Sequence, residues 1–265
     1  MRLSISNIGW DALNDEFVYK LMQEKGYAGL EIAPTRLFEE SPYDRLAEAK
    51  AWSEKLKRDF GLCVPSMQSI WYGRKEMLFG TKEERALLVD YTKKAIDFAI
   101  AIDCGNLVFG CPRNRNMNGD AEDADYLVGV RFFQELGDYA ATKGTVIGME
   151  ANPTIYNTNY INDTISAINL IKQVDSKGFL LNLDIGTMIQ NEESILDLIG
   201  NVKWINHVHI SEPGLKPIAE RAFHKDLKKI LDDENYQGFV SIEMGKVDDM
   251  YVLESKLDYV RSVFA

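Results

Sequence analysis

Residues 145–184 read TVIGMEANPTIYNTNYINDTISAINLIKQVDSKGFLLNLD, and this stretch decides the fold. The runs at 145–150 and 179–184 are apolar, bounded by turn residues and too short for helices, which is typical of buried strands. Between them, residues 164–174 repeat apolar side chains at the spacing of one helix face. A strand, a helix and a second strand predict a parallel pair joined by a right-handed crossover. Each strand ends in a carboxylate, Glu150 or Asp184.

The same alternation runs through the rest of the chain. Strand-like runs are expected at 3–6, 29–32, 62–67, 106–109, 145–150, 179–184, 205–210 and 239–243. Helices are expected at 16–25, 43–59, 82–102, 126–143, 164–174, 192–199, 223–234 and 251–264. These units predict an α/β fold, a (β/α)8 TIM barrel that occupies residues 1–265 as a single domain. An open doubly wound sheet would usually carry a glycine-rich phosphate turn after its first strand, and residues 7–10 (NIGW) are no such turn.

Composition limits the possible partners. The chain has 265 residues, a net charge of −11 and 46% hydrophobic residues, so a large core is available and a broad nucleic-acid surface is not expected. The three cysteines, Cys63, Cys104 and Cys111, form no close pair and indicate free thiols in a reducing compartment. No apolar run is long enough to span a membrane, and the first residues do not resemble a secretion signal. We therefore expect a cytoplasmic protein without a membrane partner.

Several expected strands end in a residue that interrupts apolar sequence. These residues are Glu31, Glu150, Asp184, His209 and Glu243. In a barrel they would meet at one mouth, where crowded carboxylates repel one another and lose hydration. A bound cation relieves that cost, so Glu150, Asp184, His209 and Glu243 are predicted to hold one divalent metal ion. Mostly oxygen ligands favour Mn²⁺ or Mg²⁺, and the imidazole also allows Co²⁺ or Zn²⁺. Glu31 would either support these ligands or form a structural ion pair.

These strand ends resemble the sugar phosphate isomerase/epimerase group of the xylose isomerase-like TIM barrel superfamily. The matching segments are 29–35 (GLEIAPT), 108–115 (VFGCPRNR), 150–153 (EANP), 183–188 (LDIGTM), 207–214 (HVHISEPG) and 241–244 (SIEM). The resemblance implies the same four metal ligands. It also implies that Glu150 and Glu243 are the catalytic residues, which exchange a proton with the substrate.

The sequence departs from two branches of that superfamily. The ketose 3-epimerases place a histidine at the position of Thr187, a glutamate at that of Tyr156 and an arginine at that of Leu215, next to Lys216. We therefore do not expect this chain to have the activity of the ketose 3-epimerases. The zinc endonucleases need many histidines for three metals, and this chain has three histidines in all.

The substrate is expected to be a small sugar or sugar phosphate. Arg113, Arg115 and Lys216 lie in loops at the predicted mouth and could bind an anionic group, although they could equally be solvated loop charges. Gln68 and His207 are further candidates for substrate binding, and His207 could instead be a satisfied core histidine. His224 is expected to be a solvated surface residue. Homo-oligomers are common in the superfamily and remain possible.

The predicted reaction is isomerisation or epimerisation through an enediolate, with Glu150 and Glu243 as the acid/base pair. A metal-dependent dehydratase of a keto-polyol would share the first proton abstraction. A non-catalytic barrel that keeps its ligands is the alternative outside enzymes.

Overall fold

The computed structural model describes residues 1–119 and 122–265, and its strands form one curled parallel sheet. The strands are β1 (Arg2–Ser6), β2 (Gly29–Glu31), β3 (Asn106–Phe109), β4 (Val146–Met149), β5 (Phe179–Asp184), β6 (Ile205–Ile210) and β7 (Phe239–Ile242). They lie in the order β2-β1-β7-β6-β5-β4-β3. The helices are α1 (Asp15–Glu24), α2 (Pro34–Leu37), α3 (Leu46–Phe60), α4 (Lys82–Ala101), α5 (Glu122–Lys143), α6 (Thr164–Val174), α7 (Ile185–Gln190), α8 (Ala222–Asp233) and α9 (Met250–Phe264).

Residues 62–68, here called the bridging segment, close the sheet into a barrel. Single bridges join Cys63 to β2, and Met67 both to the residue after β2 and to β3. The amide of Met67 donates to Asn106 O (2.9 Å), and that of Val108 donates to Met67 O (2.8 Å). The TIM barrel predicted from the sequence is therefore confirmed, with the bridging segment in the position of its third strand.

Two predicted elements differ from the structure. Residues 62–67 are not a continuous strand, because Pro65 has no amide hydrogen to donate to a neighbouring strand. The predicted helix at 192–199 was also wrong: α7 begins directly after β5, and residues 192–199 contain the short 3-10 helix Ile195–Leu198 instead of an α-helix. Asp184 caps α7 by accepting a hydrogen bond from the amide of Thr187, which starts the helix earlier than the apolar periodicity indicated.

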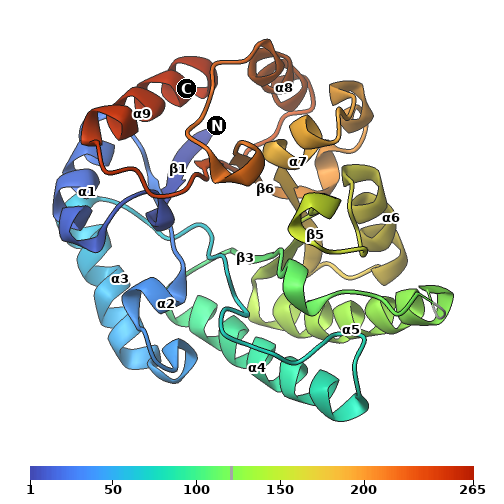
Figure 1. Cartoon of the computed structure of the whole chain (residues 1–265). Coiled ribbons are helices and arrows are strands. Elements are labelled where there is room, and N and C mark those ends of the chain that lie inside the picture. The colour runs from blue at the N-terminus through green and yellow to red at the C-terminus, as the bar shows by residue number, and fades with distance from the viewer. Residues whose placement is uncertain (120–121) are drawn as a thin grey trace.

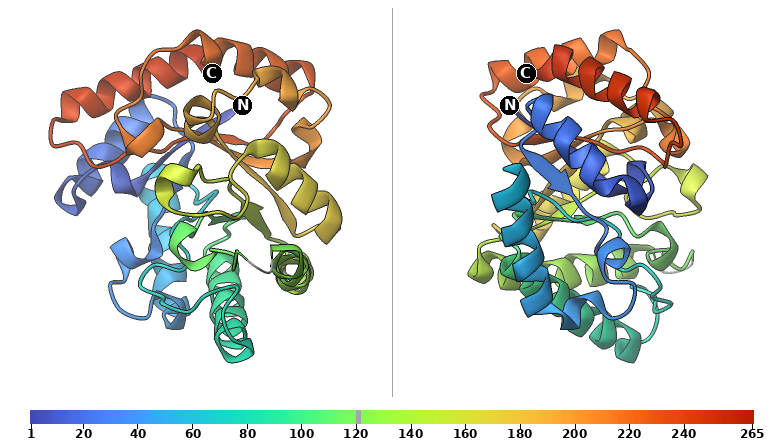
Figure 2. Two further views of the ribbon diagram at one scale, coloured as in Figure 1. Left: turned by 45° about the vertical axis from the view of Figure 1, so that its right-hand side comes forward. Right: turned by 90° about the vertical axis from the view of Figure 1, so that its left-hand side faces the viewer.

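The helices surround the sheet in sequence order (Figure 1). The ring closes where Nζ of Lys25, the residue after α1, lies 2.8 Å from a carboxylate oxygen of both Glu254 and Asp258 of α9. The two termini consequently lie near each other in every view (Figure 2). Among the described helices, none combines the length and the apolar character that crossing a membrane requires.

Polar side chains, as well as apolar ones, fill the inside of the barrel. Asn106 Nδ2 donates to Ser66 Oγ (3.0 Å) and to Asn182 Oδ1 (3.2 Å). Gly148 makes room for these amides, because a Cβ there would lie 2.5 Å from Asn106 Oδ1. The charged strand ends therefore rest on a hydrogen-bonded layer.

Candidate active site

The predicted site residues lie at the carboxyl ends of neighbouring strands. Asp184 ends β5 and pairs in register with His209 of β6. Glu150 and Glu243 directly follow β4 and β7, and their amides continue the ladders by donating to Phe109 O (3.1 Å) and Ile210 O (2.9 Å). Parallel pairing thus brings side chains far apart in sequence to one mouth of the barrel.

Three of the four predicted metal ligands converge on one point. His209 Nδ1 lies 3.2 Å from Glu150 Oε2 and 3.3 Å from Glu243 Oε2. His209 is fully buried, and both glutamates are 8% exposed. The three candidate donor atoms all lie within 4.8 Å of one another. Two carboxylates and one imidazole nitrogen at this separation fit a divalent cation.

Asp184 lies beside this group with its oxygens occupied by hydrogen bonds. Its Oδ2 accepts from the amide (2.9 Å) and the hydroxyl (2.8 Å) of Thr187, and its Oδ1 accepts from Ser211 Oγ. Burial raises the pKa of Asp184, and the negative charge of Glu150 raises it further. Asp184 thus shares the electrostatic field of the cluster, while its side chain is held by Thr187 and Ser211.

Glu31 lies on the other side of the His209 ring. Its Oε2 is 2.8 Å from His209 Nε2, and its Oε1 accepts from Gln68 Nε2 (3.2 Å). Burial alone would raise the pKa of Glu31, but the two imidazoles beside it, His209 and His207, hold that pKa well below its usual range. A carboxylate on one ring nitrogen leaves the other nitrogen directed at Glu150 and Glu243, the arrangement in which outer carboxylates orient metal-binding histidines.

The cluster also perturbs the acid that ends β7. Burial raises the pKa of Glu243; His209 opposes this rise, and the charges of Glu150 and Asp184 add to it. Like charges enclosed together favour a bound proton or a bound cation.

The chain matches a known protein family over most of its length. The sequence model described as xylose isomerase-like TIM barrel matches residues 19–262. The chain belongs to this family. No curated protein sequence matches it.

Several solved structures share the xylose isomerase-like barrel over almost their whole length. A 3-keto-D-glucoside 4-epimerase from E. coli is 21% identical, with a TM-score of 0.79 and 99% of each chain covered. A D-psicose 3-epimerase from Clostridium cellulolyticum H10 is 19% identical, with a TM-score of 0.79, covering 100% of this chain and 99% of the other. A sugar phosphate isomerase/epimerase from Parabacteroides distasonis is 14% identical, with a TM-score of 0.73 and coverage of 98% and 93%. At these identities the likeness establishes the fold.

The residues predicted to bind substrate occupy different surroundings in this xylose isomerase-like barrel. Arg113 and Lys216 are exposed on the loops after β3 and β6. Arg115 is fully buried, and its guanidinium donates to Glu150 O (2.9 Å) and to Ile161 O (3.4 Å). Gln68 is buried and donates to Ser6 Oγ (2.6 Å) as well as to Glu31. Arg115 and Gln68 therefore support the backbone and side chains of the cluster from behind.

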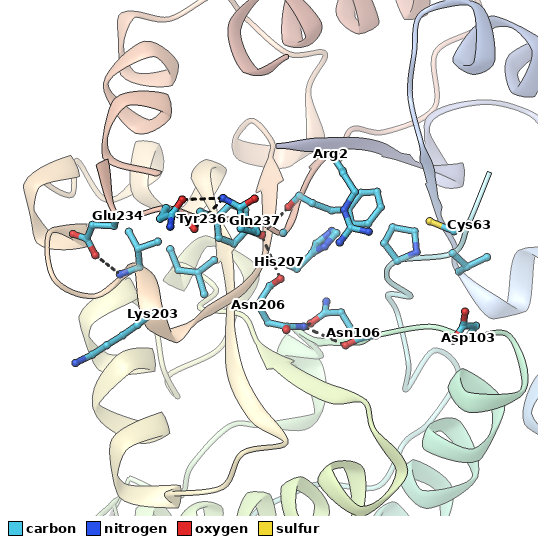
Figure 3. A pocket seen from close by; sticks show the side chains of 18 residues that line it. Arg2, Cys63, Asp103, Asn106, Lys203, Asn206, His207, Glu234, Tyr236 and Gln237 are labelled. Carbon is cyan, nitrogen blue, oxygen red and sulfur yellow. Dashed lines mark hydrogen bonds between the residues drawn. The ribbon is translucent and has the colours of Figure 1, made fainter. Parts of the chain in front are cut away.

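His207 lies between Glu31 and the opposite end of the barrel. It borders a cavity of about 590 Å³ formed by the amino-terminal ends of the strands (Figure 3). Its Nε2 is 3.3 Å from Glu31 Oε2, without the alignment of a hydrogen bond. Since barrel enzymes act at the carboxyl ends of their strands, this cavity is not the expected substrate site.

The sequence interpretation missed several residues that touch the cluster. Asn182 Nδ2 donates to Glu150 Oε2 (3.0 Å), and Asn152 Nδ2 donates to Glu150 Oε1 (2.9 Å). Gly110 leaves space beside the same carboxylate, because a Cβ there would lie 2.8 Å from Glu150 Oε1. Asn182 was detectable, because it precedes Asp184 by two residues and so faces the same side of β5. Asn152 and Gly110 lie in loops whose course no periodicity predicts.

The expectation for His224 was wrong. It is fully buried at the start of α8, with its Nδ1 2.9 Å from Tyr259 Oη. Its helix turns this position toward α9, where the ring packs near Tyr259 and Phe264.

Proposed function

We propose that this chain is a metal-dependent isomerase or epimerase that acts on a small sugar through an enediolate. The observation that carries the proposal is the approach of two carboxylates, from Glu150 and Glu243, to a single nitrogen of His209 at 3.2 and 3.3 Å. The two glutamates follow β4 and β7, which are separated by β5 and β6, so they reach this point from different sides of the barrel.

Glu150, His209 and Glu243 would hold the ion, and Asp184 is the proposed fourth ligand. Mn²⁺ or Mg²⁺ suits this donor set best, and the imidazole also suits Co²⁺ or Zn²⁺. When bound, a divalent ion supplies Lewis-acid polarisation of a carbonyl group and stabilises negative charge on its oxygen.

The protein's own carboxylates would move the proton. One of Glu150 and Glu243 takes a proton from the carbon next to the carbonyl, and the other returns one on the opposite face for epimerisation. A single carboxylate suffices for isomerisation, in which the proton returns to the neighbouring carbon. Asn152 and Asn182 hold the two oxygens of Glu150 in place by hydrogen bonds of 2.9 and 3.0 Å.

The names of the structural neighbours support the choice of substrate. They include epimerases of a keto-glucoside and of a ketohexose, on barrels of the same extent. Their low identity leaves the particular sugar open, and Thr187, Tyr156 and Leu215 argue against simple transfer of the 3-epimerase activity.

The test combines metal analysis with proton exchange. Purified protein is analysed for bound metal, loaded with Mn²⁺, and mixed with a panel of ketoses in D₂O, and deuterium next to the carbonyl is measured by NMR. We expect Glu243→Gln to lower exchange by about 10²- to 10⁴-fold while some Mn²⁺ binding persists. The control Glu220→Gln makes the same change on an exposed loop residue and should leave exchange unaltered.

Three results would count against the proposal. Retained exchange in Glu243→Gln removes its acid/base role, and absence of any metal binding favours a non-catalytic barrel. Release of water, with the ultraviolet absorbance of an enone, identifies a dehydratase instead.

A further inference from the structure

The loops at the mouth show whether the substrate can carry a phosphate. Proteins bind a phosphate through arginine forks, backbone amides and helix amino-termini, and TIM barrels often place such a site after their seventh and eighth strands. In this barrel those strands are β6 and β7. Whether these donors are free or already hydrogen-bonded within the protein therefore indicates whether the substrate carries a phosphate.

Three arginines at the mouth, Arg36, Arg74 and Arg221, contact neighbouring carboxylates. Both terminal nitrogens of Arg36 donate to Asp15, at 2.6 and 3.2 Å. Arg221 binds the buried Glu212 in a two-pronged pair, with Nε 2.7 Å from Oε1 and Nη2 2.5 Å from Oε2. Arg74, after the bridging segment, contacts Glu76 through Nη2 alone, and its Nε has no hydrogen-bond partner among the described residues. In Arg36 and Arg221 the paired donors are therefore directed at a carboxylate of the protein and away from a ligand.

Arg115 is engaged differently. It is fully buried and donates to the backbone carbonyls of Glu150 and Ile161. Its charge lies behind the Glu150 backbone, whereas the Glu150 carboxylate faces the mouth.

Two backbone amides after β7 are also used within the protein. Gly245 N donates to Leu215 O (2.7 Å), and Val247 N donates to Gly9 O (3.0 Å). The next helix, α9, is capped by Asp249, whose carboxylate accepts from Tyr251 N (2.9 Å). The Asp249 carboxylate thus occupies the amino-terminus of α9, where a phosphate would otherwise bind.

The loop after β6 shows the same pattern. Gly214 N donates to Tyr156 Oη (2.9 Å), and Leu215 N donates to Glu212 O (2.9 Å). Ala219 N donates to Glu212 Oε1 (3.2 Å). In both loops that commonly form a phosphate site, several backbone amides are consequently engaged within the protein.

The side chain of Asn152 offers a buried hydrogen-bond acceptor beside the cluster. Asn152 is 6% exposed, and its Oδ1 receives no hydrogen bond from any residue that the structure describes. It lies on the side of Gly110, next to Glu150 Oε1, where a Cβ on Gly110 would be 3.4 Å from it. Buried acceptors and carboxylates suit the hydroxyl groups of a sugar and repel a phosphate.

We propose that the substrate is an uncharged polyhydroxy ketone, either a free ketose or a keto-glycoside, and that phosphorylated sugars are rejected at the mouth. This inference rests on the proposed function and narrows it. Arg113 and Lys216 remain on the exposed rim, where hydration and salt weaken the pull of a single cation on an anion.

The test compares matched pairs of sugars on the Mn²⁺-loaded protein. Fructose is paired with fructose 6-phosphate, and tagatose with tagatose 6-phosphate, using solvent deuterium uptake for kcat/KM and calorimetry for binding. We expect each phosphate to show kcat/KM about 100-fold lower than its free sugar, and weaker binding. We also expect the rate for the phosphates alone to rise with salt, because salt screens repulsion between like charges.

The outcomes separate this inference from the proposed function. Exchange that is faster with a 6-phosphate, or tighter binding of a 6-phosphate, overturns the inference and leaves the isomerase or epimerase intact. If no sugar exchanges deuterium, the proposed function fails, and the calorimetric comparison still decides whether the mouth rejects the phosphate.

Discussion

Replacing Glu31 by glutamine should weaken metal binding without disturbing any atom of the ligands. Glu31 and His209 are both fully buried and are joined at 2.8 Å. A hydrogen bond to a charged group is worth about 1.5–3 kcal/mol, which corresponds to roughly a 10- to 150-fold change in an equilibrium constant. The amide of glutamine keeps the size and can still accept from Nε2, but it removes the charge that makes the imidazole a stronger ligand. We therefore expect Mn²⁺ affinity to fall by about 10- to 100-fold.

Calorimetric titration of Mn²⁺ into metal-stripped protein measures this effect directly. The matched control is Glu212→Gln, which neutralises another buried glutamate at the same end of the barrel, one that pairs with Arg221. It should leave Mn²⁺ affinity within about twofold of the wild type, since that pair does not touch His209. Urea unfolding of both metal-free variants separates loss of affinity from loss of the fold.

Equal Mn²⁺ affinity in Glu31→Gln and wild type would refute the reasoning. It would mean that His209 is oriented by packing alone, or that it is not a ligand. An equal loss in both variants would indicate a general electrostatic effect of removing negative charge from the mouth.

Three further changes test other contacts. Gly110→Ala puts a methyl group 2.8 Å from Glu150 Oε1, so Mn²⁺ affinity should fall about tenfold or more in a calorimetric titration, and unchanged affinity would contradict the contact. Gly29→Ala puts a methyl group 2.7 Å from both Phe239 and Pro65, and should lower the free energy of unfolding, measured in urea, by about 1–3 kcal/mol. The control is Gly105→Ala, whose methyl group would have its nearest neighbour 3.9 Å away, and it should change the free energy of unfolding by less than about 0.5 kcal/mol. Burial lowers the pKa of His224 to about 4 in the folded protein, whereas the unfolded chain keeps a pKa of about 6.5. Between these two pH values only the unfolded chain binds the proton, so the folded state loses stability as pH falls from about 6.5 to 4. Between pH 7 and 4.5 metal-free wild type should lose about 2–3 kcal/mol more than His224→Gln, and parallel losses in urea unfolding would disprove this.

The strand ends could be predicted because their signal is local. A carboxylate after an apolar run, as at Glu150 or Glu243, marks both the end of a strand and its exposure to a mouth. The bridging segment was harder, because 62–67 has the apolar composition of a strand and a single proline removes the ladder. The helix at 192–199 was misplaced because the cap at Asp184 starts α7 at once.

Arginines were the least predictable part of the site. Arg113 and Arg115 are two residues apart in one loop, yet one is exposed and the other fully buried. Only the path of the loop decides which guanidinium meets solvent and which meets the carbonyl of Glu150. His224 shows the same limit, since the phase of its helix relative to α9 sets its burial.

The bridging segment is less strongly hydrogen-bonded to its neighbours than the strands of the sheet are to one another. Glu150, His209 and Glu243 lie at the ends of the paired strands β4, β6 and β7, whereas Gln68 belongs to the bridging segment, which only isolated bridges join to its neighbours. Thermal fluctuations should thus be largest at the bridging segment and should widen the barrel mouth on that side only. Substitutions along that segment would then alter the entrance without moving the side chains of Glu150, His209 and Glu243.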